Sequence, residues 1–229
     1  MPRQYFDQAL RELRDQILTM GSYVAEELRL AMAALEALDE EAARQVYEMD
    51  RSVNDIRFAI EEECFTLIVT QQPAARDLRL VFAAANMIVD LERMGDQAKG
   101  IAKLIPHLKR HPNINRPPEL RQLGALVHSL LNDALRAYAE GDTELSASIA
   151  QRDDEVDALY ANIFTNIMFQ LAQANDPEQV KAIYELLRAA RELERFGDLV
   201  ANVAERSIYM VTGKIPELRA TSPISGRGR

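Results

Sequence analysis

The sequence predicts an all-α fold of two tandem, pseudo-symmetric three-helix bundles, with six long helices in total. Ala, Leu, Glu and Arg dominate the composition, whereas Gly and Pro number nine each and Trp is absent, and this balance favours long helices. Apolar residues recur at helical spacing, without the period-two alternation or Asn-Gly turns expected of strands. The hexapeptides LERMGD (91–96) and LERFGD (193–198) begin 102 residues apart. This repetition indicates an internal duplication.

Three helices are expected in the first half. The first covers residues 5–38, and a turn at residues 39–40 leads to the second, which continues past residue 60. Pro73 is placed at the start of the third helix, where its missing N–H leaves no hydrogen bond unmade. The third helix carries an apolar stripe with the alternating three- and four-residue spacing of a packed bundle. Its members are Leu80, Ala84, Met87, Leu91, Met94, Ala98, Ile101 and Ile105.

A proline-rich segment, PHLKRHPNINRPP (106–118), is the predicted linker between the repeats. The expected domains are residues 1–111 and 112–213, followed by a disordered tail at 214–229. In the second half, one helix covers residues 119–140 and ends at Gly141, and another starts near Asp142. The last helix opens with Asn175 or Asp176 as its N-cap and Pro177 in its first turn. Its apolar stripe repeats that of the third helix at an offset of 102 residues, through Ala182, Leu186, Ala189, Leu193, Phe196, Val200 and Val203.

Charge and composition exclude several functions. The net charge of −9 and the pI of about 5.0 argue against nucleic-acid binding, which needs a basic surface. No run approaches 18 apolar residues, and the first 20 residues are too charged for a secretory signal, so direct membrane insertion is not expected. The single Cys64 fits a reducing, cytoplasmic setting and is expected to be a small core residue. His107, His111 and His128 are expected to be surface residues in or near the linker.

Paired acids interrupt the apolar pattern of the third and last helices. Glu92 and Asp96 are four residues apart, as are Glu194 and Asp198, so each pair lies on one helical face. Glu92 directly follows Leu91 of the apolar stripe and Glu194 directly follows Leu193, so each acid pair flanks its stripe. Two carboxylates at the edge of a core repel one another and cost free energy unless a cation compensates. The alternative interpretation is an ordinary solvated acidic face, paired with the adjacent arginines at 93 and 195.

The preceding helix of each bundle supplies a matching segment. Asp50 and Asn54 have the same four-residue spacing as Asp153 and Asp157, at an offset of 103 residues. Consecutive helices of such a bundle run antiparallel, so these faces can meet those of the acid pairs. Each bundle would then present four oxygen-bearing side chains, a set that suits hard cations or iron. Lys99 lies one heptad past Glu92 and can neutralise the first set internally, which favours metal binding at the second.

Glycine separates the acids of each pair, at Gly95 and Gly197. A glycine inside a helix costs about 1 kcal/mol relative to alanine. The simplest reason for its presence is close approach of a metal or of a neighbouring helix.

These motifs and the duplication resemble the PhoU family of accessory and regulatory proteins of phosphate-specific transport. The resemblance implies two symmetric three-helix bundles whose acidic motifs bind divalent or iron-type metal ions, including multinuclear clusters. By position, the implied metal ligands are Asp50, Asn54, Glu92, Asp96, Asp153, Asp157, Glu194 and Asp198. It also implies cytoplasmic homodimers that contact the ATPase subunit of a phosphate ABC transporter and a sensor histidine kinase, and that repress the phosphate-starvation response. Asn54 departs from the family pattern, which has an acid there.

A non-enzymatic adaptor is the favoured function, because the sequence has neither a phosphate-binding loop nor a Ser-His-Asp arrangement. A di-iron enzyme on such a bundle would use Glu-x-x-His motifs, and the two hexapeptides lack the histidine. A metal-dependent all-α nucleotide pyrophosphatase is another alternative, although its acids are typically three residues apart. An accessory protein of a low-affinity phosphate permease is a third.

Overall fold

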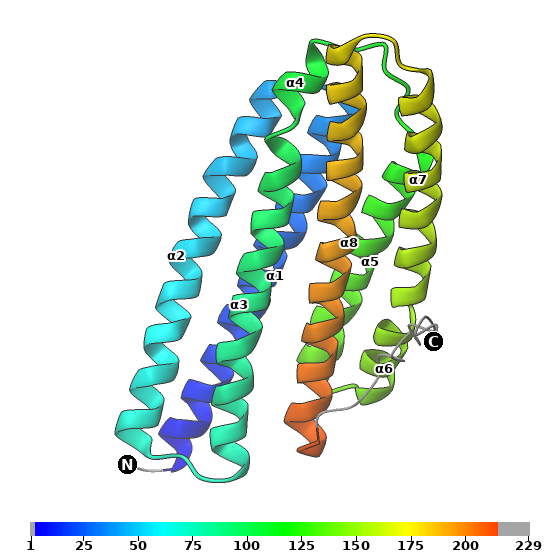
Figure 1. The fold of residues 1–229 in the computed structure, drawn as a ribbon. Coiled ribbons are helices and arrows are strands. Elements are labelled where there is room, and N and C mark those ends of the chain that lie inside the picture. Colours follow the sequence, from blue (N-terminus) through cyan, green and yellow to red (C-terminus); the bar gives the residue numbers. More distant parts are fainter. Residues whose placement is uncertain (1–2, 215–229) are drawn as a thin grey trace, which may run out of the picture.

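The structure, a computed structural model, describes residues 3–214, which form helices without strands (Figure 1). The first bundle consists of α1 (Arg3–Ala37), α2 (Glu40–Gln71) and α3 (Arg76–Ala102). The short α4 (Ile105–Lys109) follows, and the second bundle consists of α5 (Pro118–Glu140), α6 (Thr143–Gln151), α7 (Asp153–Gln173) and α8 (Pro177–Thr212). The predicted all-α fold of two tandem bundles is confirmed. Apart from Lys214, the tail expected to be disordered lies outside the described residues.

Aspartate residues are the N-caps of two equivalent helices, α2 in the first repeat and α6 in the second. Asp39 Oδ1 accepts a hydrogen bond from the backbone N–H of Glu41 at 2.9 Å, and Asp142 Oδ1 accepts one from Glu144 at 3.0 Å. Such caps satisfy N–H groups that the first helical turn leaves without partners. Of the two residues expected to cap α8, the structure selects Asp176. Asp39 and Asp142 also fix the offset between the first parts of the repeats at 103 residues.

The third helix begins later than expected. Gln72 has the left-handed helical conformation, with φ 47° and ψ 53°, and Ala75 also has a positive φ of 49°. These two residues turn the chain sharply between the antiparallel α2 and α3. Residues 72–75 are used in this turn, so Pro73 lies before the helix and α3 starts at Arg76.

The expected linker is partly helical. Pro106 lies in the first turn of α4, where its missing N–H needs no partner, and Ile105 and Leu108 are buried. Pro106 therefore lies in the first turn of a short helix and does not prevent helix formation in the linker.

The helix expected from Asp142 is divided at Arg152, which separates α6 from α7. Asp153, Asp154 and Glu155 form the first turn of α7, and acids at this position stabilise a helix N-terminus. Arg152 binds Glu155 at 3.0 Å and lies 3.9 Å from Asp133 of α5. These contacts favour a new helix start over a continuous helix.

Equivalent helices of the two bundles pack against one another. Antiparallel α3 and α8 lie side by side at the centre, and α2 and α7 lie on the outside (Figure 1). A side chain at Gly100 would meet Glu192, while at the opposite end Gly213 lies against Arg79. This pairing places equivalent residues opposite each other at the level of the two hexapeptides. The bundles are therefore related by a pseudo-twofold axis across the helices.

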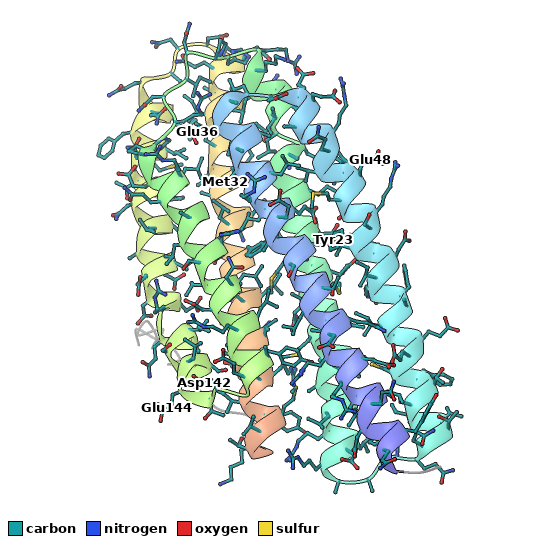
Figure 2. All side chains as sticks on the ribbon, turned by 180° about the vertical axis from the view of Figure 1, so that it is seen from behind. Tyr23, Met32, Glu36, Glu48, Asp142 and Glu144 are labelled. Carbon is teal, nitrogen blue, oxygen red and sulfur yellow. The ribbon has the colours of Figure 1, made fainter. Side chains whose placement is uncertain are left out.

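On the opposite face, α1 and α5 form a second antiparallel contact (Figure 2). Met32 of α1 lies between the two helices, and its side chain occupies the space that a Cβ atom at Gly124 would take. One continuous apolar cluster runs through both bundles, and each fully buried large aliphatic side chain in it stabilises the fold by about 1.5–3 kcal/mol. Among residues 3–214, no helix has the length and apolar content needed to cross a membrane.

Candidate metal centres

The first acid set consists of Asp50, Asn54, Glu92 and Asp96. Its side chains come from α2 and α3, as the sequence predicts. Asp50 lies on α2, and Glu92 and Asp96 lie on α3. The Lys99 ammonium joins the two helices, with Nζ 2.7 Å from Asp50 Oδ2 and 2.6 Å from Asp96 Oδ1. Burial lowers the pKa of Lys99, but these hydrogen bonds outweigh the effect and raise it. Lys99 thus pairs with two of the three acids of this set, in agreement with the internal compensation expected from the sequence.

Asn54 contributes less to the first set than an acid would. Its amide nitrogen donates to the backbone oxygen of Asp50 at 2.8 Å and lies 3.4 Å from Asp50 Oδ2. The side chain thus binds within its own helix. Glu92 lies one turn before Asp96 and is half-buried.

A fourth acid, Glu27 of α1, belongs to this region and is missing from the sequence prediction. Its side chain is 0% exposed, and neither carboxylate oxygen has a hydrogen-bond partner among the described residues. Burial raises its pKa to about 9; the Asp50 charge adds to this shift, while that of Lys99 opposes it. Glu27 is therefore protonated at neutral pH. The available sequence signal was its position three residues after Val24 and seven after Met20, on the buried side of α1.

Neighbouring helices explain both glycines. A Cβ atom at Gly95 would lie 3.0 Å from Glu27 Oε2, and one at Gly197 would lie 3.0 Å from Cγ1 of Val156. Of the two reasons expected for these glycines, the structure shows the close approach of a helix.

The second acid set is placed by α7 and α8. Asp153 is the first residue of α7, Asp157 lies one turn later, and Glu194 and Asp198 lie on α8. Burial raises the pKa of Glu194, and the charges of Asp198 and Asp157 raise it further, against the opposing effect of nearby arginines. The carboxylates of the two helices are thus close enough to repel one another.

The surroundings of the second set differ from those of the first. At the position equivalent to Lys99 stands Ala201, which is buried. A set of carboxylates that destabilise each other's charged form fits a hard cation, which would remove the repulsion. Asp153, Asp157, Glu194 and Asp198 are the residues that would hold it.

Two other expectations concern single residues. Cys64 is buried as predicted, and burial raises the pKa of its thiol to about 12. The histidines are less exposed than expected. His107 faces α8 with its side chain 18% exposed, and His128 lies half-buried within α5.

The fold and these sets define a class of protein: a duplicated helical bundle with an acidic site in each half. The family model described as "PhoU domain" matches residues 17–105 and 120–207, one match in each bundle. The chain belongs to the PhoU family.

Curated relatives match over most of their length. A protein of Clostridium acetobutylicum, named phosphate-specific transport system accessory protein PhoU homolog, is 36% identical over 219 residues, 95% of this chain and 99% of the relative. The Escherichia coli phosphate-specific transport system accessory protein PhoU is 33% identical over 211 residues, 91% of this chain and 86% of the relative.

Solved structures have the same fold. PhoU from Pseudomonas aeruginosa superposes with a TM-score of 0.86 at 34% identity, covering 91% of this chain and all of that one. The phosphate transport system regulatory protein PhoU from Streptococcus pneumoniae gives a TM-score of 0.85 at 33% identity, with coverage of 93% and 99%.

Proposed function

We propose that this protein is a cytoplasmic accessory protein of a phosphate-specific transport system and a non-enzymatic negative regulator of phosphate uptake and of the phosphate-starvation response. The names of the relatives support the transport system and favour it over a low-affinity permease. The name of the pneumococcal structure supports a regulatory role. As a homodimer, the protein would act as an adaptor between the transporter ATPase subunit and a sensor histidine kinase.

The single observation that carries the metal part of this proposal is the mutual repulsion at the second acid set. The charges of Asp198 and Asp157 raise the pKa of Glu194 beyond the effect of burial, and the position equivalent to Lys99 is the buried, apolar Ala201. A divalent or iron-type ion, or a small cluster, bound by Asp153, Asp157, Glu194 and Asp198 would reduce the repulsion between these carboxylates. Because these ligands come from α7 and α8, the metal would crosslink the two helices and fix a docking surface for the partners.

The regulatory function is tested with a phosphate-starvation reporter in a strain that lacks this gene, grown with abundant phosphate. We expect the reporter to be active, and the wild-type gene to silence it. If the reporter stays silent in the deletion strain, the regulatory proposal is wrong.

The metal site is tested by two matched double variants. Glu194→Ala with Asp198→Ala is expected to lose the bound metal, measured by elemental analysis, and to fail to silence the reporter. The equivalent pair Glu92→Ala with Asp96→Ala is expected to keep the metal, because Asp50 and Asp96 of the first set already pair with Lys99. Unchanged metal content and thermal stability in the Glu194/Asp198 variant would contradict the proposed ligand set.

A further inference from the structure

The geometry points to a transition-metal site of the zinc type formed by His107, His111 and Glu178, separate from both acid sets. His107 belongs to α4, His111 follows the end of α4, and Glu178 lies in the first turn of α8. One ligand atom from each of the three residues lies within 4.8 Å of the others. The site would join the connection between the repeats to the start of the last helix, and it goes beyond the proposed function.

The ligand atoms need only small movements to reach coordination geometry. His107 Nε2 lies 3.9 Å from Glu178 Oε2, and the two imidazole rings have centroids 5.6 Å apart. In a tetrahedral zinc site the ligand atoms lie about 3.3 Å apart, because each is about 2.0–2.1 Å from the ion. The Glu178 side chain is 52% exposed, so it is free to make this adjustment.

Glu185 is placed to orient His107 toward the ion. Nδ1 of His107 is buried and has no hydrogen-bond partner among residues 3–214. Oε1 of Glu185 lies 3.8 Å from this nitrogen, and the carboxylate is held by Arg188 through its other oxygen at 2.8 Å. Histidine ligands usually donate their second ring N–H to a carboxylate, which fixes the tautomer and the ring orientation. Glu185 can take this role while Nε2 faces the ion.

The existing partner of Glu178 is a weak competitor. Lys181 Nζ lies 2.5 Å from Glu178 Oε1, with both side chains more than half exposed. Exposed pairs of this kind contribute little free energy. Oε2 of Glu178, the atom facing His107, is the one assigned to the ion.

The chemistry of this site differs from that of the acid sets. Two imidazoles and one carboxylate with an open fourth position suit Zn²⁺, Ni²⁺ or Cu²⁺, whereas sets made only of oxygen suit Mg²⁺, Ca²⁺, Mn²⁺ or iron. Glu178 and Glu194 are separated by about 24 Å along α8 at 1.5 Å per residue. The two kinds of site can therefore be loaded and removed independently.

The test is calorimetric titration of Zn²⁺ into the full chain, purified without a polyhistidine tag and stripped of metal, at pH 7.5 with excess Mg²⁺ present to occupy oxygen sites. We expect one equivalent of Zn²⁺ to bind the wild type and to raise its Tm. His111→Ala and Glu178→Gln should each lose this equivalent. His128→Ala is the matched control, because it removes a half-buried histidine outside the cluster, and it should bind as the wild type does.

Two further variants make the assignment specific. Glu185→Gln should weaken Zn²⁺ binding about 10- to 100-fold while retaining the visible absorption of tetrahedral Co²⁺. The Glu194→Ala/Asp198→Ala variant should still bind one full equivalent of Zn²⁺. Zn²⁺ binding that survives in His111→Ala, or that disappears in the Glu194/Asp198 variant, would overturn this site. Neither result decides whether the protein regulates phosphate uptake, which the reporter tests separately.

Discussion

The two repeats carry the same acidic hexapeptide but compensate its charge in different ways. In the first repeat, Lys99 binds Asp50 and Asp96 directly, and the buried Glu27 lies behind them. The equivalent positions in the second repeat are Ala201 and Leu130, both buried and apolar. The comparison shows that the motif alone does not determine the electrostatics of its site, because Lys99 and Glu27, which change it, lie outside the hexapeptide, one of them on another helix.

Asp50 of α2 and the equivalent Asp153 of α7 also differ in how their negative charge is stabilised. Asp50 lies in the interior of a continuous helix and is 6% exposed, whereas Asp153 is the first residue of α7. A carboxylate at a helix N-terminus is stabilised by the helix dipole, and one inside a helix depends on a side-chain partner. Asp50 thus depends on Lys99, whereas the position of Asp153 at the start of α7 contributes to its stabilisation.

The largest effect is expected when the internal cation of the first repeat is removed. Lys99→Met should lower the free energy of unfolding by about 3–5 kcal/mol, because it leaves the buried Asp50 carboxylate without its charge partner. Urea denaturation at pH 7 in the presence of a chelator measures this loss. The control Lys181→Met removes an exposed pair and should change stability by less than about 1 kcal/mol. Equal effects of the two substitutions would show that the first site is not self-neutralised.

An intermediate effect is expected when Glu27 is replaced by the residue of the other repeat. Glu27→Leu removes a buried carboxyl group without hydrogen-bond partners and should raise the free energy of unfolding by about 1–3 kcal/mol at pH 7. Glu27→Gln keeps the polar group and should gain less. Chemical denaturation of the three proteins in parallel measures the difference.

The same substitution should also change the pH dependence of stability. The pKa of Glu27 rises from 4.5 to about 9 on folding, so between these values the folded chain retains a proton that the unfolded chain has lost. The stability of the wild type should therefore fall as pH rises through this window, by at most about 1.4 kcal/mol per pH unit. Both variants should lack this contribution, so the advantage of Glu27→Leu over the wild type should grow with pH. A constant difference would show that Glu27 is ionised in the folded protein.

The smallest effect is expected at the two glycines. Alanine gains about 1 kcal/mol in helix propensity over glycine. At Gly95 the nearest atom is the end of the flexible Glu27 side chain, whereas at Gly197 it is a methyl group of Val156, whose β-branched side chain is stiff. Gly197→Ala should thus be less stable than Gly95→Ala by about 1 kcal/mol, since crowding a packed core costs free energy. Thermal denaturation of the two variants compares them directly, and the opposite order would contradict this account.

Local patterns were enough to predict the long helices, the turn at residues 39–40, the N-cap of α8 and the convergence of Asp50 with Asp96. These features depend on spacing within one helix or between consecutive antiparallel helices. Glu27 was missed because its role depends on which face of α1 meets α3. The division at Arg152 and the late start of α3 were missed because each is set by competition between helix propensity and the geometry of a turn.

The antiparallel contact between α3 and α8 has a consequence for the ancestry of the fold. A single repeat would leave the apolar face of its third helix uncovered, and two identical copies related by a twofold axis would cover it through an isologous interface, which requires the same residues on both sides. Gene fusion replaces this association by an intramolecular one with a high effective concentration. It also removes the requirement for identical halves, so that one half can have a lysine at position 99 and the other an alanine at position 201.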